Sequence, residues 1–443
     1  MHHHSLLSIL LLIVTTSSYA SASDQFETCS GIVPMPVRYD SISITDFGGV
    51  GDGRTVNTKA FRAAVYRIQH LRRRGGTVLY VPAGVYLTES FNLTSHMTLY
   101  LAKDAVIRAT QDTSNWPLVD PLPSYGRGRE LPGGRYASFI LGYGVHDVVM
   151  TGENGTIDGQ GAVWWDMWRG KTLQHTRPHL LEFMYSKQIL ISNVIFKDSP
   201  FWNIHPVYCS NLVIRYVTIL APTDSPNTDG IDPDSSSNVC IEDSYISTGD
   251  DLIAIKSGWD EYGIAFGRPS SVITIRRITG SSPFAGIAIG SETSGGVQNI
   301  RVEHVTLYNM GVGVHIKTDI GRGGYIRNVT MSNIYMENAR KGIKIAGDVG
   351  DHPDDNYNQA AVPEVKDIKI MNVWGYNVLQ PGLIMGIKDA PFTSICLSNI
   401  HLFGSQGPRT APWQCSDVKG AAVKVSPWPC AELISSPSCS VPF

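Results

Sequence analysis

Short apolar runs recur along the chain beyond residue 76, and a small polar residue opens each of them. The clearest runs start 27 to 39 residues apart, at Asn211, Asn238, Ser271, Asn299, Asn328, Asp367 and Ser394. In most units a second and a third run follow, such as Val305–Tyr308 and Val312–Lys317. Three short strands per unit at this spacing are typical of a parallel β-helix. We therefore predict an all-β solenoid in which each unit forms one coil.

A helical period precedes the repeats. From Thr58 to Arg72 the apolar residues recur at helical spacing, at Phe61, Ala64, Val65, Ile68 and Leu71. An alternating strand at Ser41–Thr45 and a glycine-rich loop come before it, but these glycines do not match the G-x-G-x-x-G pattern of a dinucleotide site in any register. We expect a helical cap over the N-terminal end of the solenoid.

Other fold classes fit the pattern less well. Doubly wound folds and (β/α)8 barrels need crossover helices, and no helical period separates the repeats. An antiparallel sandwich remains the alternative, although Asn-Gly and Asp-Gly hairpin signals are few. No linker or composition break interrupts the 443 residues after the leader, so residues 23–443 are predicted to form a single domain.

The N-terminus predicts export. Leu6–Val14 is a short apolar run, and Ala20-Ser21-Ala22 fits a small-residue cleavage site, so residues 1–22 resemble a signal peptide. No later window approaches the roughly 20 apolar residues of a membrane span. Asn-x-Ser/Thr sequons at Asn92, Asn154 and Asn328 mark candidate glycosylation sites of a secreted protein.

Cysteine usage and charge narrow the possibilities further. Four of the seven cysteines fall in the last 48 residues, where disulfides could hold a loop-rich tail. The odd count leaves one thiol over, and Cys209 or Cys240, both in apolar runs, is expected to be buried. No cysteine or histidine spacing suggests a metal site, and no cofactor is expected. A net charge of −3 provides no basic surplus for binding nucleic acid or a membrane surface.

Acidic residues gather in one part of the repeats. Asp229 and Asp250–Asp251 lie about one coil apart in sequence, and neighbouring coils stack at about 4.7–4.9 Å. Later coils should add Pro283–Gly286 and then His315 and Lys317 to the same face. Carboxylates at the centre of a groove with cations beside them suit a polyanionic sugar chain.

This constellation fits glycoside hydrolysis. Inversion needs one carboxylic acid to protonate the leaving oxygen and one carboxylate to activate water, about 6.5–9.5 Å apart. Asp250 and Asp251 can share a groove only at a turn, which Gly249 would allow. Each residue alone would be ordinary turn or surface chemistry. A calcium loop starting at Asp232 is excluded, because Ser237 and Asp243 stand where it needs glycine and glutamate.

At these residues the chain resembles the polygalacturonase family of glycoside hydrolases, from about Ile44 to Leu397 and most closely its plant members. The motifs that carry the likeness are Asn227-Thr-Asp229-Gly230 and Gly249-Asp250-Asp251. The resemblance implies a right-handed parallel β-helix that acts on pectic polysaccharide outside the cell, in the cell wall, as a monomer. It implies that Asp250 is the general acid and that Asp229 and Asp251 hold and activate the water.

Two motifs depart from the family. The Gly-His-Gly motif falls on Phe284-Ala285-Gly286, and the Arg-Ile-Lys motif reads His315-Ile316-Lys317. A tyrosine that is often found shortly after the Arg-Ile-Lys motif in the family aligns near Val349 in this chain. Lys317 and His315 are then the expected substrate-binding cations, and the aspartates should raise the pKa of His315. The rival hypotheses are a carbohydrate-binding wall protein with a degenerate site, a hydrolase for another pectic backbone, and a lyase on the same fold.

Overall fold

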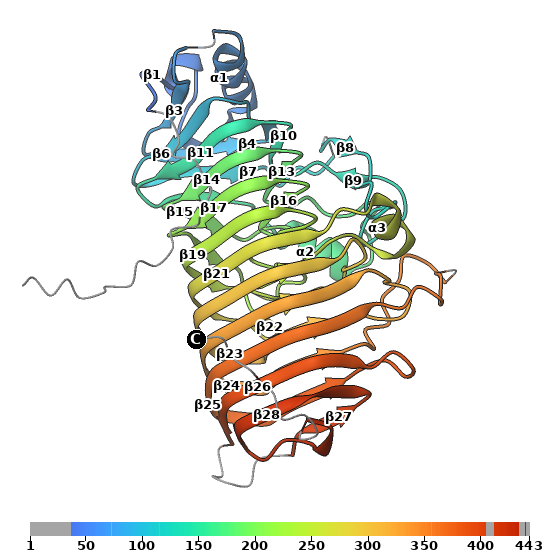
Figure 1. Ribbon diagram of the computed structural model, residues 1–443. Coiled ribbons are helices and arrows are strands. Elements are labelled where there is room, and N and C mark those ends of the chain that lie inside the picture. The colour runs from blue at the N-terminus through green and yellow to red at the C-terminus, as the bar shows by residue number, and fades with distance from the viewer. Residues whose placement is uncertain are drawn as a thin grey trace, which may run out of the picture.

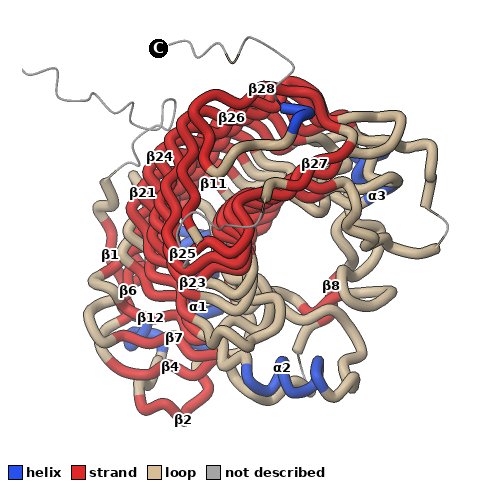
Figure 2. The backbone as a smooth tube through the Cα atoms, turned by 90° about the horizontal axis from the view of Figure 1, so that it is seen from below, coloured by secondary structure: helices blue, strands red, loops and turns tan. Residues whose placement is uncertain are grey.

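A computed structural model describes residues 37–71, 73–114, 116–355, 357–404, 412–433 and 439. The predicted signal peptide, residues 1–22, lies outside this range. Parallel strands stack coil upon coil from the N-terminal to the C-terminal end (Figure 1), and the stacks superpose when the coil is viewed along its axis (Figure 2). The predicted right-handed parallel β-helix is confirmed.

The first coils contain short strands, namely β1 Asp40–Ser43, β2 Asp52–Val56, β3 Thr77–Val81, β4 Gly84–Thr88, β5 Phe91–Asn92, β6 Met97–Leu101, β7 Ala105–Ala109, β8 Leu118–Val119, β9 Arg135–Tyr136, β10 Ile140–Tyr143, β11 His146–Gly152 and β12 Gly155–Asp158. Within this set β8 and β9 form an antiparallel pair. The central coils contain β13 Leu181–Met184, β14 Lys187–Ser192, β15 Val194–Lys197, β16 Ile204–Val207, β17 Ser210–Arg215, β18 Thr218–Leu220, β19 Ser237–Ser247 and β20 Ile253–Ile255.

The strands that follow are β21 Ser270–Ser281, β22 Ala285–Ile289, β23 Val297–Lys317, β24 Tyr325–Ala346, β25 Glu364–Met385, β26 Phe392–Phe403, β27 Gln414–Ser416 and β28 Val418–Ser426. They lengthen up to β25 and bend around the coil, whereas β26, β27 and β28 are shorter again. Their inward side chains stack without interruption, as in the fully buried column Ile241, Ile275, Val302, Met331, Ile370 and Leu397. These columns form the hydrophobic core.

The polar residue that opens each repeat has a structural role. The backbone there is left-handed, with φ between 51° and 59° at Asn211, Asn238, Asn299, Asn328, Asp367 and Ser394. In the remaining repeat the left-handed residue is Val272, one position after the predicted start at Ser271. Asparagine, aspartate and serine tolerate this conformation better than bulky residues do. Their side chains also form ladders, since Asn238 donates to Asn211 (2.7 Å) and Asn328 donates to Asn299 (2.6 Å). The repeat is therefore encoded by residues that suit the turn.

Helices lie outside the coil or at its end. The predicted cap is α1, Thr58–Leu71, whose buried side includes Phe61, Ala64 and Ile68. The predicted strand after Ser41 is shorter, because a 3₁₀ turn begins at Ile44 and extends to Phe47. Two helices went unpredicted, α2 (Ala162–Arg169) and α3 (Asp260–Phe266), since seven or eight residues in a loop give little periodicity. A second 3₁₀ turn is Ala431–Leu433.

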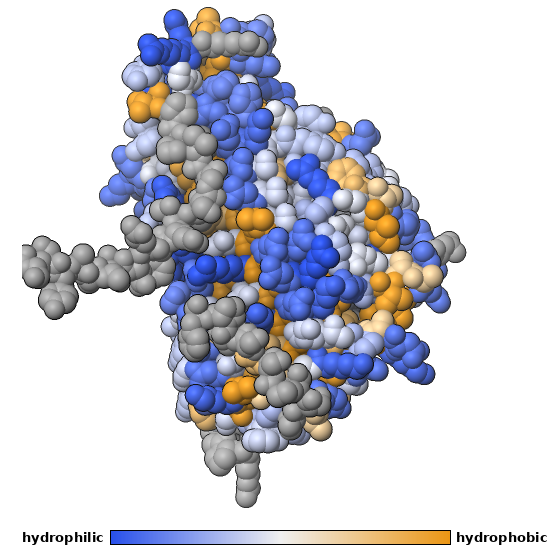
Figure 3. Space-filling model, in the orientation of Figure 1, coloured by the Kyte–Doolittle hydropathy of each residue, from blue (hydrophilic) through white to orange (hydrophobic). Residues whose placement is uncertain are grey.

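The predicted disulfide-containing tail is confirmed by two bonds, Cys396–Cys439 and Cys415–Cys430. Cys209 is the free, buried thiol, whereas Cys240 is disulfide-bonded. Asn92, Asn154 and Asn328 are exposed, and their glycosylation stays a prediction. Within the described ranges, no helix is both long and apolar enough to cross a bilayer. Hydrophilic residues dominate the face drawn in Figure 3, and hydrophobic ones are scattered over it.

Val272 breaks the polar series and gives a test of its role. This β-branched residue has φ +55° and is 52% exposed, between the coil of Asn238 and the coil of Asn299. Val272→Asn should relieve the strain and extend the ladder, raising the free energy of unfolding by about 1 kcal/mol. Denaturant titration measures it. The reverse change Asn299→Val should be destabilising; a Val272→Asn protein no more stable than the parent would contradict the strain argument.

Candidate active site

Three aspartates meet on the outer surface of the coil, as predicted. Asp229 precedes a backbone bridge between Ile231 and Ile253, and Asp250–Asp251 form the bend between β19 and β20. Backbone hydrogen bonds fix the two segments, because the amide of Gly230 donates to the carbonyl of Asp251 at 2.9 Å. One carboxylate oxygen from each aspartate lies within 4.8 Å of the others.

Gly249 makes this bend, as the sequence suggested. A Cβ at residue 249 would lie 2.1 Å from the carbonyl oxygen of Ser225, so no other residue fits there without a shift of the backbone. The Gly249 amide donates to the Thr228 hydroxyl at 3.0 Å, which ties the bend to the coil that carries Asp229. Asp250 and Asp251 both line the same cavity in consequence.

Lys317 provides the positive charge closest to the trio. Its Nζ lies 2.6 Å from Oδ2 of Asp251, and the Ala285 amide donates to Oδ1 at 2.9 Å. Burial by itself raises the pKa of Asp251, but the charge and hydrogen bond of Lys317, together with more distant positive charges such as Lys256, outweigh burial and hold that pKa below its usual value. Asp251 is therefore an ionised carboxylate, each of whose oxygens accepts one hydrogen bond from the protein.

In the other two aspartates, Asp229 and Asp250, the pKa is raised rather than lowered. Burial, then repulsion from Asp229 and Asp251, raises the pKa of Asp250 well above its usual value. Burial, opposed in part by Lys256, raises the pKa of Asp229 to about 6. Such groups titrate as a set. Because the environments separate the pKa values of Asp250 and Asp251, the site holds a protonated acid beside a carboxylate, which is the arrangement that acid–base chemistry needs.

Sequence reasoning missed a buried charged layer beneath the trio. Lys256, directly after β20, lies 3.9 Å from Asp229, 4.0 Å from Asp232 and 3.2 Å from Glu292, and all of these side chains are at most 5% exposed. Burial, and then Asp229, raises the pKa of Asp232 well above its usual value. The sequence did contain a signal for this layer. Lys256 follows the last apolar residue of a strand, as Lys317 does in a later coil.

His315 is the one predicted binding cation that the structure corrects. In the sheet, the backbone of His315 lies in register with Ala288 of the preceding coil and Lys344 of the following coil. His315 does not line the cavity. Burial, then repulsion from Lys317, lowers the pKa of His315 to about 3 rather than raising it. The aspartates were expected to dominate, but only Asp251 acts on His315 in that direction, against three lysines. His315 is therefore neutral in mildly acidic solution.

At the motif that lacks its histidine, the cavity is lined by Phe284. Phe284 is 52% exposed, whereas Ala285 is buried in β22. The wall is therefore apolar where the family has an imidazole. Val349, to which the tyrosine position was loosely assigned, also lines the cavity.

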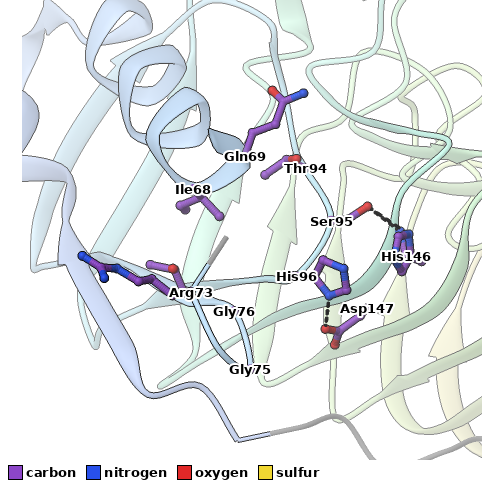
Figure 4. A pocket seen from close by; sticks show the side chains of 11 residues that line it. Ile68, Gln69, Arg73, Gly75, Gly76, Thr94, Ser95, His96, His146 and Asp147 are labelled. Carbon is purple, nitrogen blue, oxygen red and sulfur yellow. Dashed lines mark hydrogen bonds and ion pairs between the residues drawn. The ribbon is translucent and has the colours of Figure 1, made fainter. Parts of the chain in front are cut away.

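The cavity has a volume of about 590 Å³, within the range of pockets that bury small ligands. The aspartates are surrounded mainly by aromatic and charged side chains, namely Arg127, Arg129, Glu130, Trp168, Phe201, Trp202, Lys256, Trp259, Glu292, Lys317, Asp351 and His352, together with Asn227, Ser291 and Pro353. A larger cavity, about 690 Å³, lies beside α1. There Asp147 is neutralised by Arg38 and faces His96 (Figure 4), so this second cavity has no acid–carboxylate pair.

The donor sets do not favour a metal at either acidic cluster. In the trio, Lys317 already binds Asp251, and Lys256 adds a second positive charge beside Asp229, so a divalent ion would be repelled. A buried cluster of His179, Glu182 and His205 also brings ligand atoms together. Its carboxylate is held through both oxygens by the Arg135 guanidinium at 2.9 Å, which leaves no anion for a metal.

The β-helix and its acidic cavity are those of a hydrolase that acts on glycosidic bonds. The chain belongs to the glycosyl hydrolases family 28, whose profile matches residues 79–427. It is 49% identical over 397 residues to a probable polygalacturonase of Vitis vinifera, covering 89% of this chain and 81% of that one.

Two solved structures share the fold at the same level of sequence identity. An exopolygalacturonase from Thermotoga maritima superposes with a TM-score of 0.78 and 26% identity, over 90% of this chain and 94% of the other. A polygalacturonase from Erwinia carotovora ssp. carotovora gives 0.71 and 26%, over 89% and 99%. The predicted family is thus confirmed, and with it the prediction that the protein is an enzyme.

Lys317 can be tested as the group that keeps Asp251 ionised. In Lys317→Met, Asp251 loses the strongest interaction that opposes its burial, so the Asp251 pKa should rise above the value in the parent. Carbon-13 NMR titration of the aspartate carboxyls reports the shift directly. Lys366→Met removes the same charge from a surface pair with Glu364 and should leave Asp251 unchanged. An unchanged Asp251 pKa in Lys317→Met would contradict the proposed electrostatic role.

Proposed function

We propose that the protein hydrolyses α-1,4-galacturonosyl bonds of pectic polysaccharide by acid–base catalysis at Asp229, Asp250 and Asp251. The observation that carries the proposal is the meeting of three carboxyls within 4.8 Å of one another, with Lys317 2.6 Å from Asp251. This geometry raises the pKa of Asp250 and lowers that of Asp251. Family membership and the polygalacturonase relatives support the substrate class. We further propose that residues 23–443 act as one secreted, monomeric domain in the cell wall after loss of residues 1–22.

Asp250 is the proposed general acid. It keeps its proton because it is buried beside two other carboxyls, and Asn227 Nδ2 lies 3.4 Å from its Oδ2, where an amide can orient it. A protonated carboxyl at the cavity wall can donate to the leaving glycosidic oxygen. Activity should decline as rising pH removes this proton.

Asp229 and Asp251 are the proposed water-activating pair. Two oxygens up to 4.8 Å apart can both accept a hydrogen bond of about 2.8 Å from one water molecule between them. This spacing is shorter than the 6.5–9.5 Å that is typical of inverting enzymes, so that comparison gives no support to inversion. The gap itself supports inversion, because one water molecule between the two carboxyls can donate to both of them. Each Asp251 oxygen already accepts from Lys317 or Ala285 and still has a lone pair for that water.

A hydrolase for a different pectic backbone is the second candidate. The apolar Phe284 and the neutral His315 stand where the family has charged or hydrogen-bonding side chains, and both changes weaken recognition of a plain polygalacturonate. Incubation with polygalacturonate, methyl-esterified pectin and rhamnose-containing pectin, followed by analysis of new reducing ends, distinguishes the two candidates. Unsaturated product would indicate a lyase, and binding without product would indicate a degenerate site.

The substitution Asp250→Asn tests whether Asp250 is the general acid. The amide cannot donate a proton as a carboxylic acid does, so turnover should fall by at least about 10²–10⁴, while substrate binding persists. Initial rates of reducing-end release and calorimetric binding measure the two effects. The neighbouring change Ser281→Ala, in β21 of the next coil, is the control and should retain activity. Near-normal turnover of Asp250→Asn would refute the assignment.

The stereochemistry of the product tests whether water held between Asp229 and Asp251 attacks the sugar directly. Direct attack by water held between Asp229 and Asp251 should invert the anomeric centre, so the first product formed from an α-linkage should be the β-anomer. Proton NMR in the first minutes of reaction, before mutarotation, reports it. An α-anomer formed first would instead require a covalent sugar–enzyme intermediate.

A further inference from the structure

We propose that Arg127 is the side chain that recognises a uronate carboxylate of the substrate, in place of the motif arginine whose position His315 occupies. The proposal rests on the proposed function and names the recognition element of that same cavity. No sequence motif singled out Arg127, since it lies in the long loop between β8 and β9.

Most of the positive charge in the cavity is not free to bind a polyanion. Six carboxyls line it, namely Glu130, Asp229, Asp250, Asp251, Glu292 and Asp351, against four lysine and arginine side chains. Three of the four cations are already committed to these carboxyls. Lys317 binds Asp251 at 2.6 Å and Lys256 binds Glu292 at 3.2 Å. Arg129 binds Glu292 at 2.6 Å and also pairs with Asp351.

Arg127 is the exception. Within the described residues it has no acidic partner, and its Nε and Nη1 donate only to the backbone carbonyls of Gly128 and Pro353. A guanidinium has five N–H donors, so three remain available. Its planar fork matches the two oxygens of a carboxylate, which an ammonium cannot do. Arg127 is half-buried in the cavity wall, where such a bond is shielded from water.

The loop holds Arg127 rigidly from both sides. Before it, the Tyr125 hydroxyl donates to Asp234 at 2.7 Å in the core of the coil. After it, Arg129 is fixed by Glu292, and Glu130 accepts from the fully buried Arg177 at 3.0 Å. Little ordering entropy is then lost when a substrate carboxylate binds, because the guanidinium is already in place.

The test compares acidic and neutral forms of one ligand. Binding of galacturonate hexamers and of their methyl esters is measured by calorimetry in the Asp250→Asn background, with kcat/KM of the otherwise unchanged protein as a second measurement. Arg127→Gln keeps a donor for the Pro353 carbonyl but removes the charge. It should weaken binding of the acidic hexamer about 10- to 100-fold and leave the ester nearly unaffected.

Two further variants separate charge recognition from a structural role. Arg127→Lys should restore part of the affinity for the acid, because it restores the charge without the fork. Arg54→Ala removes an exposed arginine near the N-terminal cap and should change neither ligand. Equal binding of the acidic hexamer by Arg127→Gln and its parent, or an equal loss for acid and ester, would overturn the proposal. A parent that cleaves no pectic substrate would instead refute the proposed function.

Discussion

Hydrogen bonding between successive coils sets their backbones about 4.8 Å apart, and this spacing decides what the outer surface can do. Side chains that follow one another up the stack must meet at that distance. The Ile231–Ile253 bridge brings Asp229 to the bend of Asp250 and Asp251 without any long-range loop. A cluster of carboxyls that would repel in most folds is therefore a direct product of the core register, which the buried isoleucine columns maintain.

Such a cluster is tolerated because buried cations balance it unevenly. Lys317 contacts one aspartate closely, and Lys256 shares its charge among Asp229, Asp232 and Glu292 at longer range. The result is one carboxylate and neighbouring protonated acids within a few ångströms of one another. A symmetrical arrangement of the same charges would stabilise all carboxyls equally and remove the proton donor, so the unequal placement matters more than the total charge.

Features with local physical causes could be predicted from the sequence. The Asn and Ser residues at repeat starts suit left-handed turns, so they marked the coils, and Gly249 marked the bend that joins the aspartates. Features that depend on packing between distant segments could not be predicted. The layer of Lys256 and Glu292 and the pKa of His315 are set by neighbours from other coils. The helices α2 and α3, with eight and seven residues, are too short to give a helical period.

The same distinction explains why family motifs describe this cavity incompletely. Motif residues lie on the coils, where stacking fixes them, whereas other parts of the cavity lining come from the β8–β9 loop and the segment around Pro353. Loops between coils can change without disturbing the core register, so a lost contact on the stacked face can be replaced from the loop face. Arg127, carried by the loop, pairs with no acidic side chain among the described residues, whereas Lys317, on the stack, forms an ion pair with Asp251.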